Sequence, residues 1–268
     1  MAELGATEPT QFARARLRVN SLEMPATLAS YAPKLSILLP AYNEADVLKQ
    51  NVESIEKVAA QIAHPFEIVI AEDGCSDETP RIACDISNNS SRVIHLHSNH
   101  RLGKGMAIRE AFKVSKGQIV VFMDADLSTS LDHLHDVVKL IENGYDAVIG
   151  SRYARGSIAT RPVFRTAASK AYNFLVRLLF QDGVLDHQCG FKGFNRPVLK
   201  DILDEVTEDG FSFDTELILR MKMKKLRVTE IPVIWTEIDE RTSKFRLLTD
   251  GILMGLKLFK LKLRLQVP

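Results

Sequence analysis

The feature that most constrains the fold is the alternation of short apolar runs with helical patterns in the first half of the chain. Runs of four to eight apolar residues are typical of buried strands in parallel sheets. Strands that alternate with helices form right-handed βαβ units. The sequence therefore predicts an α/β fold with a mostly parallel sheet flanked by helices. The predicted strands are 35–39, 67–71, 93–96 and 118–123, and the predicted helices are 45–63, a helix from 78 onward, and 106–114.

The second half continues the pattern less regularly. A basic stretch at 154–162 separates a strand from a long helix, and the polar and aromatic segment 186–194 predicts no definite element. The predicted strands here are 145–150 and 228–233, and the predicted helices are 131–142, 163–180, a helix that ends near 223, and a final helix from 247.

Three of the apolar runs end in acidic residues: Glu44, Asp73, and the pair Asp124 and Asp126. The carboxyl ends of parallel strands share one edge of the sheet, where ligands bind in open α/β folds. Two carboxylates separated by one small residue suit a magnesium-like cation that also binds phosphate oxygens. The acid pair alone is equally compatible with an acidic surface turn. Three acidic turns on one edge favour a nucleotide-and-metal cleft.

Composition excludes several classes of protein. The 268 residues carry a net charge of +1, so no global field attracts nucleic acid, and no nucleic-acid partner is expected. Three cysteines without metal-ligand spacing indicate a reduced, intracellular chain. No apolar run approaches the roughly 20 residues of a membrane span. Residues 1–33 lack the apolar core of a signal peptide and are expected to be a lead-in.

Four motifs in order resemble the inverting nucleotide-sugar glycosyltransferases of family 2, which have the GT-A (Rossmann-like) fold. Two further segments, 188–192 and 213–217, are most similar to the dolichyl-phosphate glucosyltransferase branch of the polyprenyl-phosphate sugar synthases. The resemblance implies a GT-A domain over 34–246. The motifs are Pro40-Ala41-Tyr42-Asn43-Glu44, Glu72-Asp73-Gly74-Cys75-Ser76-Asp77, Asp124-Ala125-Asp126 and Gly150-Ser151-Arg152-Tyr153.

The resemblance also implies a reaction. A hexose, expected to be glucose from UDP-glucose, moves to the phosphate of dolichol or another polyprenol. Two alternatives stay open: a mannosyl transfer from GDP-mannose, and a family 2 transfer to a soluble or polysaccharide acceptor. A nucleotide-sugar-binding regulator without activity is a further alternative, which the intact acidic residues disfavour.

Site residues follow from the same resemblance, position by position. The nucleotide sugar would contact Pro40, Tyr42, Glu44, Ala71, Glu72, Asp73, Asp124 and Ala125, with Asp73 accepting from the imide of uracil. Mg²⁺ or Mn²⁺ would be held by Asp124, Asp126 and Ser128, although the family often has glutamine where Ser128 stands. The acceptor phosphate would bind Arg152, Arg165 and Ser169. The expected catalytic residues are Asp126, Arg152, Arg241 and Lys244, the last two on a loop that closes on the donor diphosphate.

Two features leave open questions. Asp214 and Glu216 are either helix-start acids favoured by the helix dipole or groups that orient the sugar hydroxyls. In the final segment, 247–268, the basic residues Lys257, Lys260 and Arg264 share a narrow face among leucines. Such a helix lies in a membrane interface or packs on the protein with its lysines in water. The expectation is a basic amphipathic helix that associates with the membrane surface, with the protein peripheral on the cytoplasmic face.

Overall fold

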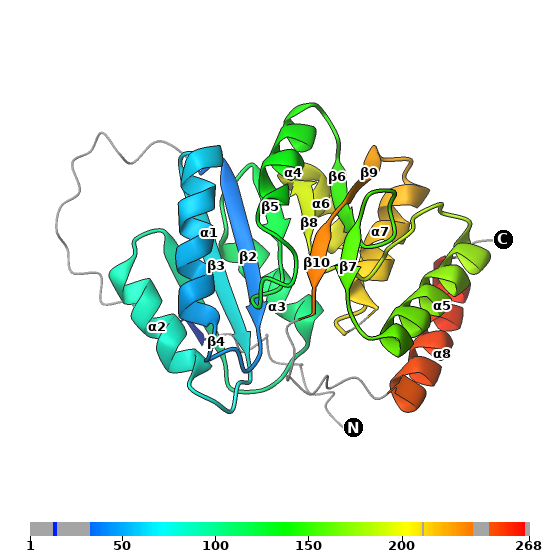
Figure 1. Cartoon of the computed structure of the whole chain (residues 1–268), viewed down its shortest axis with the longest axis horizontal. Helices are drawn as coiled ribbons and strands as arrows, with labels where there is room; N and C mark the ends of the chain where they lie inside the picture. The colour runs from blue at the N-terminus through cyan, green and yellow to red at the C-terminus, as the bar shows by residue number, and fades with distance from the viewer. Residues whose placement is uncertain (1–12, 15–32, 211, 238–246, 266–268) are drawn as a thin grey trace, which may run out of the picture.

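The computed structural model describes residues 13–14, 33–210, 212–237 and 247–265, with side chains of the last helix described from residue 255. Its centre is a twisted sheet with helices on both faces (Figure 1). Within the described residues the sheet has eight strands in the order β1-β4-β3-β2-β5-β8-β6-β9, and β10 and β7 form a separate parallel pair. The expected α/β fold with a mostly parallel sheet is confirmed.

The strands are short, as the apolar runs predict. Their bounds are β1 (Ala13–Arg14), β2 (Leu35–Ala41), β3 (Phe66–Asp73), β4 (Val93–Ser98), β5 (Ile119–Phe122), β6 (Ala147–Ser151), β7 (Ile158–Thr160), β8 (Lys192–Asn195), β9 (Val228–Pro232) and β10 (Ile234–Thr236). The helices are α1 (Leu48–Ile62), α2 (Thr79–Asn89), α3 (Lys104–Val114), α4 (His133–Glu142), α5 (Val163–Phe180), α6 (Arg196–Leu203), α7 (Phe213–Met223) and α8 (Leu247–Leu265).

Two apolar cores lie on the two faces of the sheet. Helices α1, α2 and α4 pack on one face, where strand residues such as Ile37 and Val121 point toward Leu48 and Val137. Helices α3, α6 and α7 cover the other face. Because both faces are covered, every residue of β3 and β5 is buried, which explains the continuous apolar runs in the sequence.

The segment 186–194, which predicts no definite element, contains the largest departure from a parallel sheet. Its end forms β8, which runs antiparallel between β5 and β6. Sequence periodicity did not indicate β8, because Lys192 and Gly193 interrupt its apolar pattern. The short elements β7, α6 and β10 were missed as well, and α1 begins at Leu48, three residues later than predicted.

The long helix α5 has the predicted bounds, and α8 lies beside it (Figure 1). The buried contact between them consists of Val176 and Phe180 of α5 with Leu258 and Leu261 of α8. Among the helices of the described residues, none combines the length and the apolar character that a membrane span requires.

Candidate active site

The sheet brings the acidic turns together at one edge. Strands β3, β2 and β5 are neighbours, and their register places Ala41 opposite Glu72 and Leu38 opposite Phe122. The chain then leaves β5 and reaches Asp124 and Asp126 just beyond the same edge. The side-chain amide of Asn51 in α1 donates to the carbonyl of Ala125 at 2.8 Å, which anchors this turn. The expected convergence of the acidic turns is therefore present in the backbone.

Asp124 is paired with a cation of the protein. The ammonium of Lys104, at the start of α3, lies 2.8 Å from its Oδ1. Although burial opposes ionisation, the charge of Lys104 holds the pKa of Asp124 below its usual value. The same ammonium lies 3.8 Å from Asp214 at the start of α7, and Asp214 also accepts from Lys192 at 2.9 Å. Charges of alternating sign thus run from Lys192 through Asp214 and Lys104 to Asp124.

Asp126 has a different environment. Burial and the neighbouring charge of Asp124 raise the pKa of the Asp126 carboxyl. The backbone N–H of Ser128 donates to its Oδ1 at 2.9 Å, which partly offsets this effect. Leu127 between them adopts a left-handed conformation with φ of 54°, a strained state that places Asp126 and Ser128 in contact. The two acids therefore differ: Asp124 has a cationic partner in Lys104, whereas among the described residues Asp126 lacks a neutralising charge of that strength.

The acids of β3 are used within the protein. Both oxygens of Asp73 accept backbone N–H groups of the loop before α3, from Leu102 at 2.6 Å and Gly103 at 2.8 Å. Glu72 is fully buried and contacts His97 and His95 of β4. The contact of Asp73 with the imide of uracil stays a prediction. Within the protein, its carboxylate holds the loop that leads into Lys104.

The other residues assigned to the nucleotide sugar are distributed between the core and the edge. Ala71 and Ala125 have buried side chains that belong to opposite cores, so at these positions only the backbone is available to a ligand. Tyr42 lies at the edge with the guanidinium of Arg101 3.7 Å from its ring centroid. Pro40 and Glu44 are half-buried at the same edge.

Arg152, at the end of β6, forms the centre of a second cluster. Its guanidinium binds buried Asp186 through two hydrogen bonds, of 2.7 and 2.8 Å, and its Nη2 lies 3.4 Å from Ser169 Oγ of α5. Despite burial, the Asp186 carboxylate raises the pKa of Arg152, so the guanidinium stays charged. Two of the residues expected at the acceptor phosphate therefore lie together.

Arg165, the third of those residues, contacts Glu237. Arg161 lies 3.8 Å from the same carboxylate, and its guanidinium carbon is 5.1 Å from the ring centroid of Trp235. Burial and the nearby charge of Arg152 lower the pKa of Arg161. The guanidinium carbon of Arg152 also lies 5.5 Å from the ring centroid of Trp235. Arg161 was not predicted as a site residue, since a charge in a polar stretch has no distinguishing sequence signal.

The segment from Asp186 to Gly190 joins the two clusters. Asp186 binds Arg152, the side-chain oxygen of Gln188 accepts from Ser169 at 3.3 Å, and Gly190 lies directly against Asp124. A Cβ on Gly190 would be 1.8 Å from Asp124 Oδ2, so only glycine permits this close approach. The acidic edge and the arginine cluster are consequently parts of one site.

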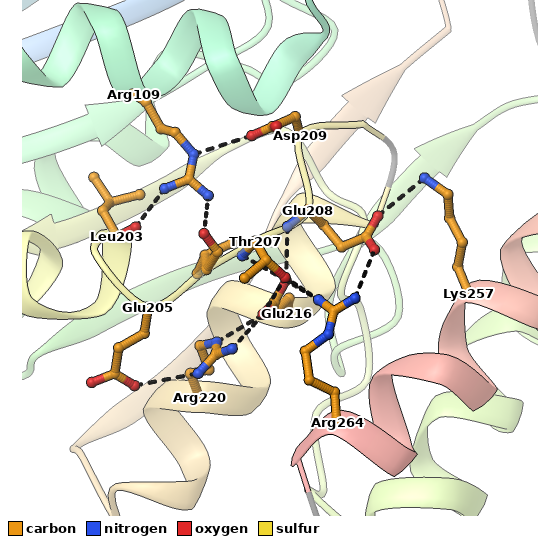
Figure 2. A network of polar contacts seen from close by, with 11 residues as sticks. Arg109, Leu203, Glu205, Thr207, Glu208, Asp209, Glu216, Arg220, Lys257 and Arg264 are labelled. Carbon is orange, nitrogen blue, oxygen red and sulfur yellow. Dashed lines mark hydrogen bonds and ion pairs between the residues drawn. The ribbon is translucent and has the colours of Figure 1, made fainter. Parts of the chain in front are cut away.

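Several site contacts lay beyond sequence reasoning. Lys104, Asp186 and Lys192 were not predicted as site residues, although Lys104 follows a glycine in a loop after a strand, which is a usable signal. Of the two helix-start acids, Asp214 faces Lys104. Glu216 is instead buried beside Arg220 and the backbone of residues 207–208 (Figure 2). Arg241 and Lys244, expected on a closing loop, lie outside the described residues.

Comparisons with known proteins agree with this architecture. The chain is 38% identical over 239 residues to the glycosyltransferase AglD of Haloferax volcanii, covering 88% of this chain and 38% of that protein. It is 31% identical to the dolichyl-phosphate beta-glucosyltransferase of Drosophila melanogaster, covering 92% of this chain and 79% of that one. The chain has the same fold as glucosyl-3-phosphoglycerate synthase from Mycobacterium tuberculosis, with a TM-score of 0.60 and 19% sequence identity. The match covers 88% of this chain and 81% of that one, whose structure contains Mn²⁺, UDP and glucosyl-3-phosphoglycerate.

The chain thus spans less than half of AglD but most of the Drosophila enzyme. The profile of glycosyl transferase family 2 matches residues 36–203, which include all three acidic turns, Arg152 and the segment from Asp186 to Gly190. With this match and these relatives, the chain belongs to glycosyl transferase family 2 and is a glycosyltransferase.

Proposed function

We propose that the chain is an inverting hexosyltransferase that moves glucose from UDP-glucose to the phosphate of dolichol or another polyprenol. One observation carries the proposal: the segment from Asp186 to Gly190 joins an acidic edge to an arginine-rich cluster. The acidic edge suits a cation with a sugar diphosphate, and the arginines suit a second anionic group. The relatives named dolichyl-phosphate beta-glucosyltransferase support this choice of acceptor and sugar.

The donor set suits a divalent cation. Asp124 and Asp126 offer carboxylate oxygens, which Mg²⁺ and Mn²⁺ prefer. The described residues contain no group of three or more His, Cys, Asp or Glu that could enclose a metal, so the diphosphate and water would complete its coordination. Mn²⁺ in the related fold of glucosyl-3-phosphoglycerate synthase supports the same use here. When bound, the cation would stabilise negative charge on the leaving diphosphate.

The residues of the protein prepare both reactants. Arg152, held by Asp186, and Arg165 would neutralise the acceptor phosphate, which is largely a dianion at neutral pH because its second pKa is about 6. An oxygen of this dianion attacks the anomeric carbon, and the bond from that carbon to the diphosphate oxygen breaks with its electron pair. No general base is required, since the nucleophile carries no proton. A single displacement converts an α-linked donor into a β-linked lipid product.

Lys104 has a further role in this proposal. Its ammonium is bound to the carboxylate of Asp124. Asp126 is therefore the acid with more capacity to bind a divalent cation directly. Asp124 would then serve the ribose or a water on the metal. The remaining expectations, Arg241 and Lys244 on the donor diphosphate and a position on the cytoplasmic face of a membrane, belong to the same proposal.

The test is a transfer assay with radiolabelled UDP-glucose or GDP-mannose, a divalent cation and polyprenyl phosphate, followed by extraction with organic solvent. Label from UDP-glucose should enter the organic phase, and label from GDP-mannose should not. Asp126→Asn should abolish transfer, whereas Asp136→Asn, an exposed acid on α4, should leave it unchanged. Label that stays in water with every donor would contradict the lipid acceptor, and transfer from GDP-mannose alone would contradict the donor.

A further inference from the structure

A buried histidine lies in the segment that joins the acidic edge to Arg152. The side chain of His187 has no exposed surface, and both of its ring nitrogens contact polar groups. Its Nε2 lies 2.6 Å from the carboxylate of Asp182, and its Nδ1 lies 2.9 Å from Oδ1 of Asn173. Asp182 and Asn173 are buried as well. The three side chains therefore form a polar cluster inside the protein.

The surroundings of Asn173 decide which atoms of this cluster carry protons. Its Oδ1 accepts the backbone N–H of His187 at 2.9 Å, and its Nδ2 donates to the backbone carbonyl of Ser169 at 2.9 Å. Since a backbone N–H only donates and a carbonyl only accepts, the orientation of the amide is fixed. Nδ1 of His187 must then donate to the same Oδ1, and Nε2 shares a proton with Asp182. Neither ring nitrogen is therefore free to accept a proton from a ligand.

His187 and Asp182 close the short loop that follows α5. Gln181, at the end of α5, and Gly183 adopt left-handed conformations, with φ of 52° and 76°, and the chain turns back there toward His187. The second carboxylate oxygen of Asp182, Oδ1, has no hydrogen-bond partner among the residues that the structure describes. The imidazole is thus the group that compensates the charge of Asp182. Its loss would leave a buried carboxylate without a partner, which is strongly destabilising.

The residues on either side of His187 contact the proposed acceptor-phosphate site. Asp186, the residue before it, binds Arg152, and the side chain of the residue after it accepts from the hydroxyl of Ser169. Asn173 lies one turn after Ser169 on α5 and holds both the backbone and the ring of His187. The distance between α5 and the segment that carries Asp186 therefore depends on the contacts of His187.

The donor side of the same segment is held separately. Phe191 is buried in the core, and its carbonyl accepts the backbone N–H of Gly150 at 2.9 Å. Gly190, which lies against Asp124, directly precedes this anchored residue. A change at His187 should consequently act on the arginine cluster and leave the acidic edge in place.

We propose that the pair of His187 and Asp182 positions the acceptor-phosphate site. By holding α5 against the segment that carries Asp186, the pair keeps Ser169 Oγ 3.4 Å from Arg152 Nη2. At that spacing the hydroxyl and the guanidinium can donate to one phosphate group. His187 is fully buried, so it acts through its neighbours and does not touch the acceptor. The inference rests on the proposed function, since it concerns how the site of that reaction holds its acceptor.

The experiment measures the Michaelis constants for both substrates, with UDP-glucose as donor and geranyl phosphate, a water-soluble prenyl phosphate, as acceptor. His187→Leu replaces the ring by an apolar side chain that donates no hydrogen bond. The KM for geranyl phosphate should rise at least about tenfold, the equivalent of one hydrogen bond to a charged group. The KM for UDP-glucose should stay at the parental value, because the donor side is anchored by Phe191. A parental KM for geranyl phosphate would overturn the proposal.

The double variant Asp182→Ala/His187→Leu distinguishes positioning from stability. His187→Leu alone leaves the carboxylate of Asp182 unpaired and should lower the melting temperature. The double variant removes that carboxylate, so its melting temperature should return toward the parental value. Its KM for geranyl phosphate should stay raised, because the hydrogen bond from the ring to Asn173 is still missing. A KM that recovers together with the melting temperature would show a purely structural role and overturn the proposal. Should His187→Leu fail to fold, the double variant alone decides.

Leu199→Ala is the control for lost stability. Leu199 is fully buried on α6, in the core shared with α3 and α7. The change opens a cavity there, so it should lower the melting temperature and leave both Michaelis constants at parental values. A rise in the KM for geranyl phosphate as large as in His187→Leu would show that any loss of stability has this effect, and it would overturn the proposal.

Isothermal titration separates this inference from the proposed function. With Mn²⁺ and UDP present, the parent chain should bind geranyl phosphate, and His187→Leu should bind it at least about tenfold more weakly. That difference in a parent chain that transfers no glucose would overturn the proposed function and support the positioning role. Transfer by the parent chain together with equal binding by both chains would do the reverse. A parent chain that neither binds nor transfers would overturn both.

Discussion

At the scale of single residues, the site depends on two neighbours that fix the position of Asp124. One side of its carboxylate meets Lys104, and another meets the Cα of Gly190. These two contacts fix two sides of the carboxylate, while 38% of the Asp124 side chain stays exposed. Its ionised state and its position are both set by residues that lie far away in the chain.

Gly190→Ala should strongly reduce turnover. The new Cβ would lie 1.8 Å from Asp124 Oδ2, so the carboxylate must move and its contact with Lys104 weakens. A displacement of this kind can lower the rate about a hundredfold, and overpacking costs about 1–3 kcal/mol of unfolding free energy. The measurements are steady-state kinetics and thermal unfolding.

Gly255→Ala is the matched control, because nothing lies within 4 Å of the position of its Cβ. This variant should keep its activity and gain slightly in stability through better helix propensity. Parental turnover of Gly190→Ala would show that Asp124 tolerates displacement and does not act in the site.

At the scale of elements, β3 and β4 are joined by a buried acid and two histidines. Glu72 and His97 are directly opposite in the parallel register, and His95 Nε2 lies 3.6 Å from Glu72 Oε1. Although burial opposes both shifts, their hydrogen bond lowers the pKa of Glu72 and raises the pKa of His97. This contact supports the strand whose last residue, Asp73, holds the loop before α3.

His97→Gln should therefore destabilise the protein in a pH-dependent way. Because the pKa of His97 is raised in the folded state, its charged contact contributes fully to the free energy of unfolding below about pH 6.5. This contribution is lost as the pH rises through the pKa of His97 in the folded state. Because the pKa of Glu72 is lowered in the folded state, its charged contact contributes fully to the free energy of unfolding above about pH 4.5. This contribution is lost as the pH falls through the pKa of Glu72 in the folded state. Chemical denaturation should show the largest difference in free energy of unfolding between the parent chain and His97→Gln in the pH range between these two limits. This difference should be about 1 kcal/mol or less, because about a third of the His97 side chain is exposed.

His135→Gln, at an exposed position on α4, is the control and should change stability little. A difference between the parent chain and His97→Gln that stays constant up to pH 9 would contradict a charged contact between Glu72 and His97.

Helix α8 is attached by two kinds of contact, and Glu208→Gln distinguishes them. The change removes the charge that Lys257 and Arg264 share, while the apolar contact of Leu258 with α5 remains. Because both basic side chains are more than 40% exposed, global stability should fall by about 1 kcal/mol or less. Glu208→Gln should nevertheless speed up amide hydrogen exchange in α8, while exchange in α7 stays as in the parent chain. Glu110→Gln, which breaks an ion pair within α3, should leave exchange in α8 unchanged.

At the scale of the whole molecule, the apolar cores that stabilise the fold and the charged site lie in different parts of the protein. Both apolar cores lie between the sheet and its helices, and the charged site lies at the edge beyond the strands. The acidic edge is not part of either core. A cation there would contribute to the reaction and to donor binding rather than to folding.

Removal of divalent cations should consequently abolish turnover and leave the melting temperature of the free protein nearly unchanged. With UDP present, added Mn²⁺ should raise the melting temperature by a few degrees, since only the folded state binds both ligands. Differential scanning fluorimetry with and without chelator measures both effects. Unfolding caused by the chelator alone would indicate a structural metal and contradict this assignment.

The sequence by itself determined the alternation of elements, the edge at which Asp73, Asp124 and Asp126 gather, and the bounds of α5. These features follow from apolar periodicity and from the fixed geometry of parallel strands, which are local properties of the chain. Only the tertiary structure decided that β8 enters the sheet antiparallel, that Asp186 and Gly190 connect Arg152 to Asp124, and that α8 turns Lys257 toward Glu208. Those contacts join residues up to 76 positions apart in the chain, as between Ile119 and Asn195, and their partners are selected by packing and charge in three dimensions.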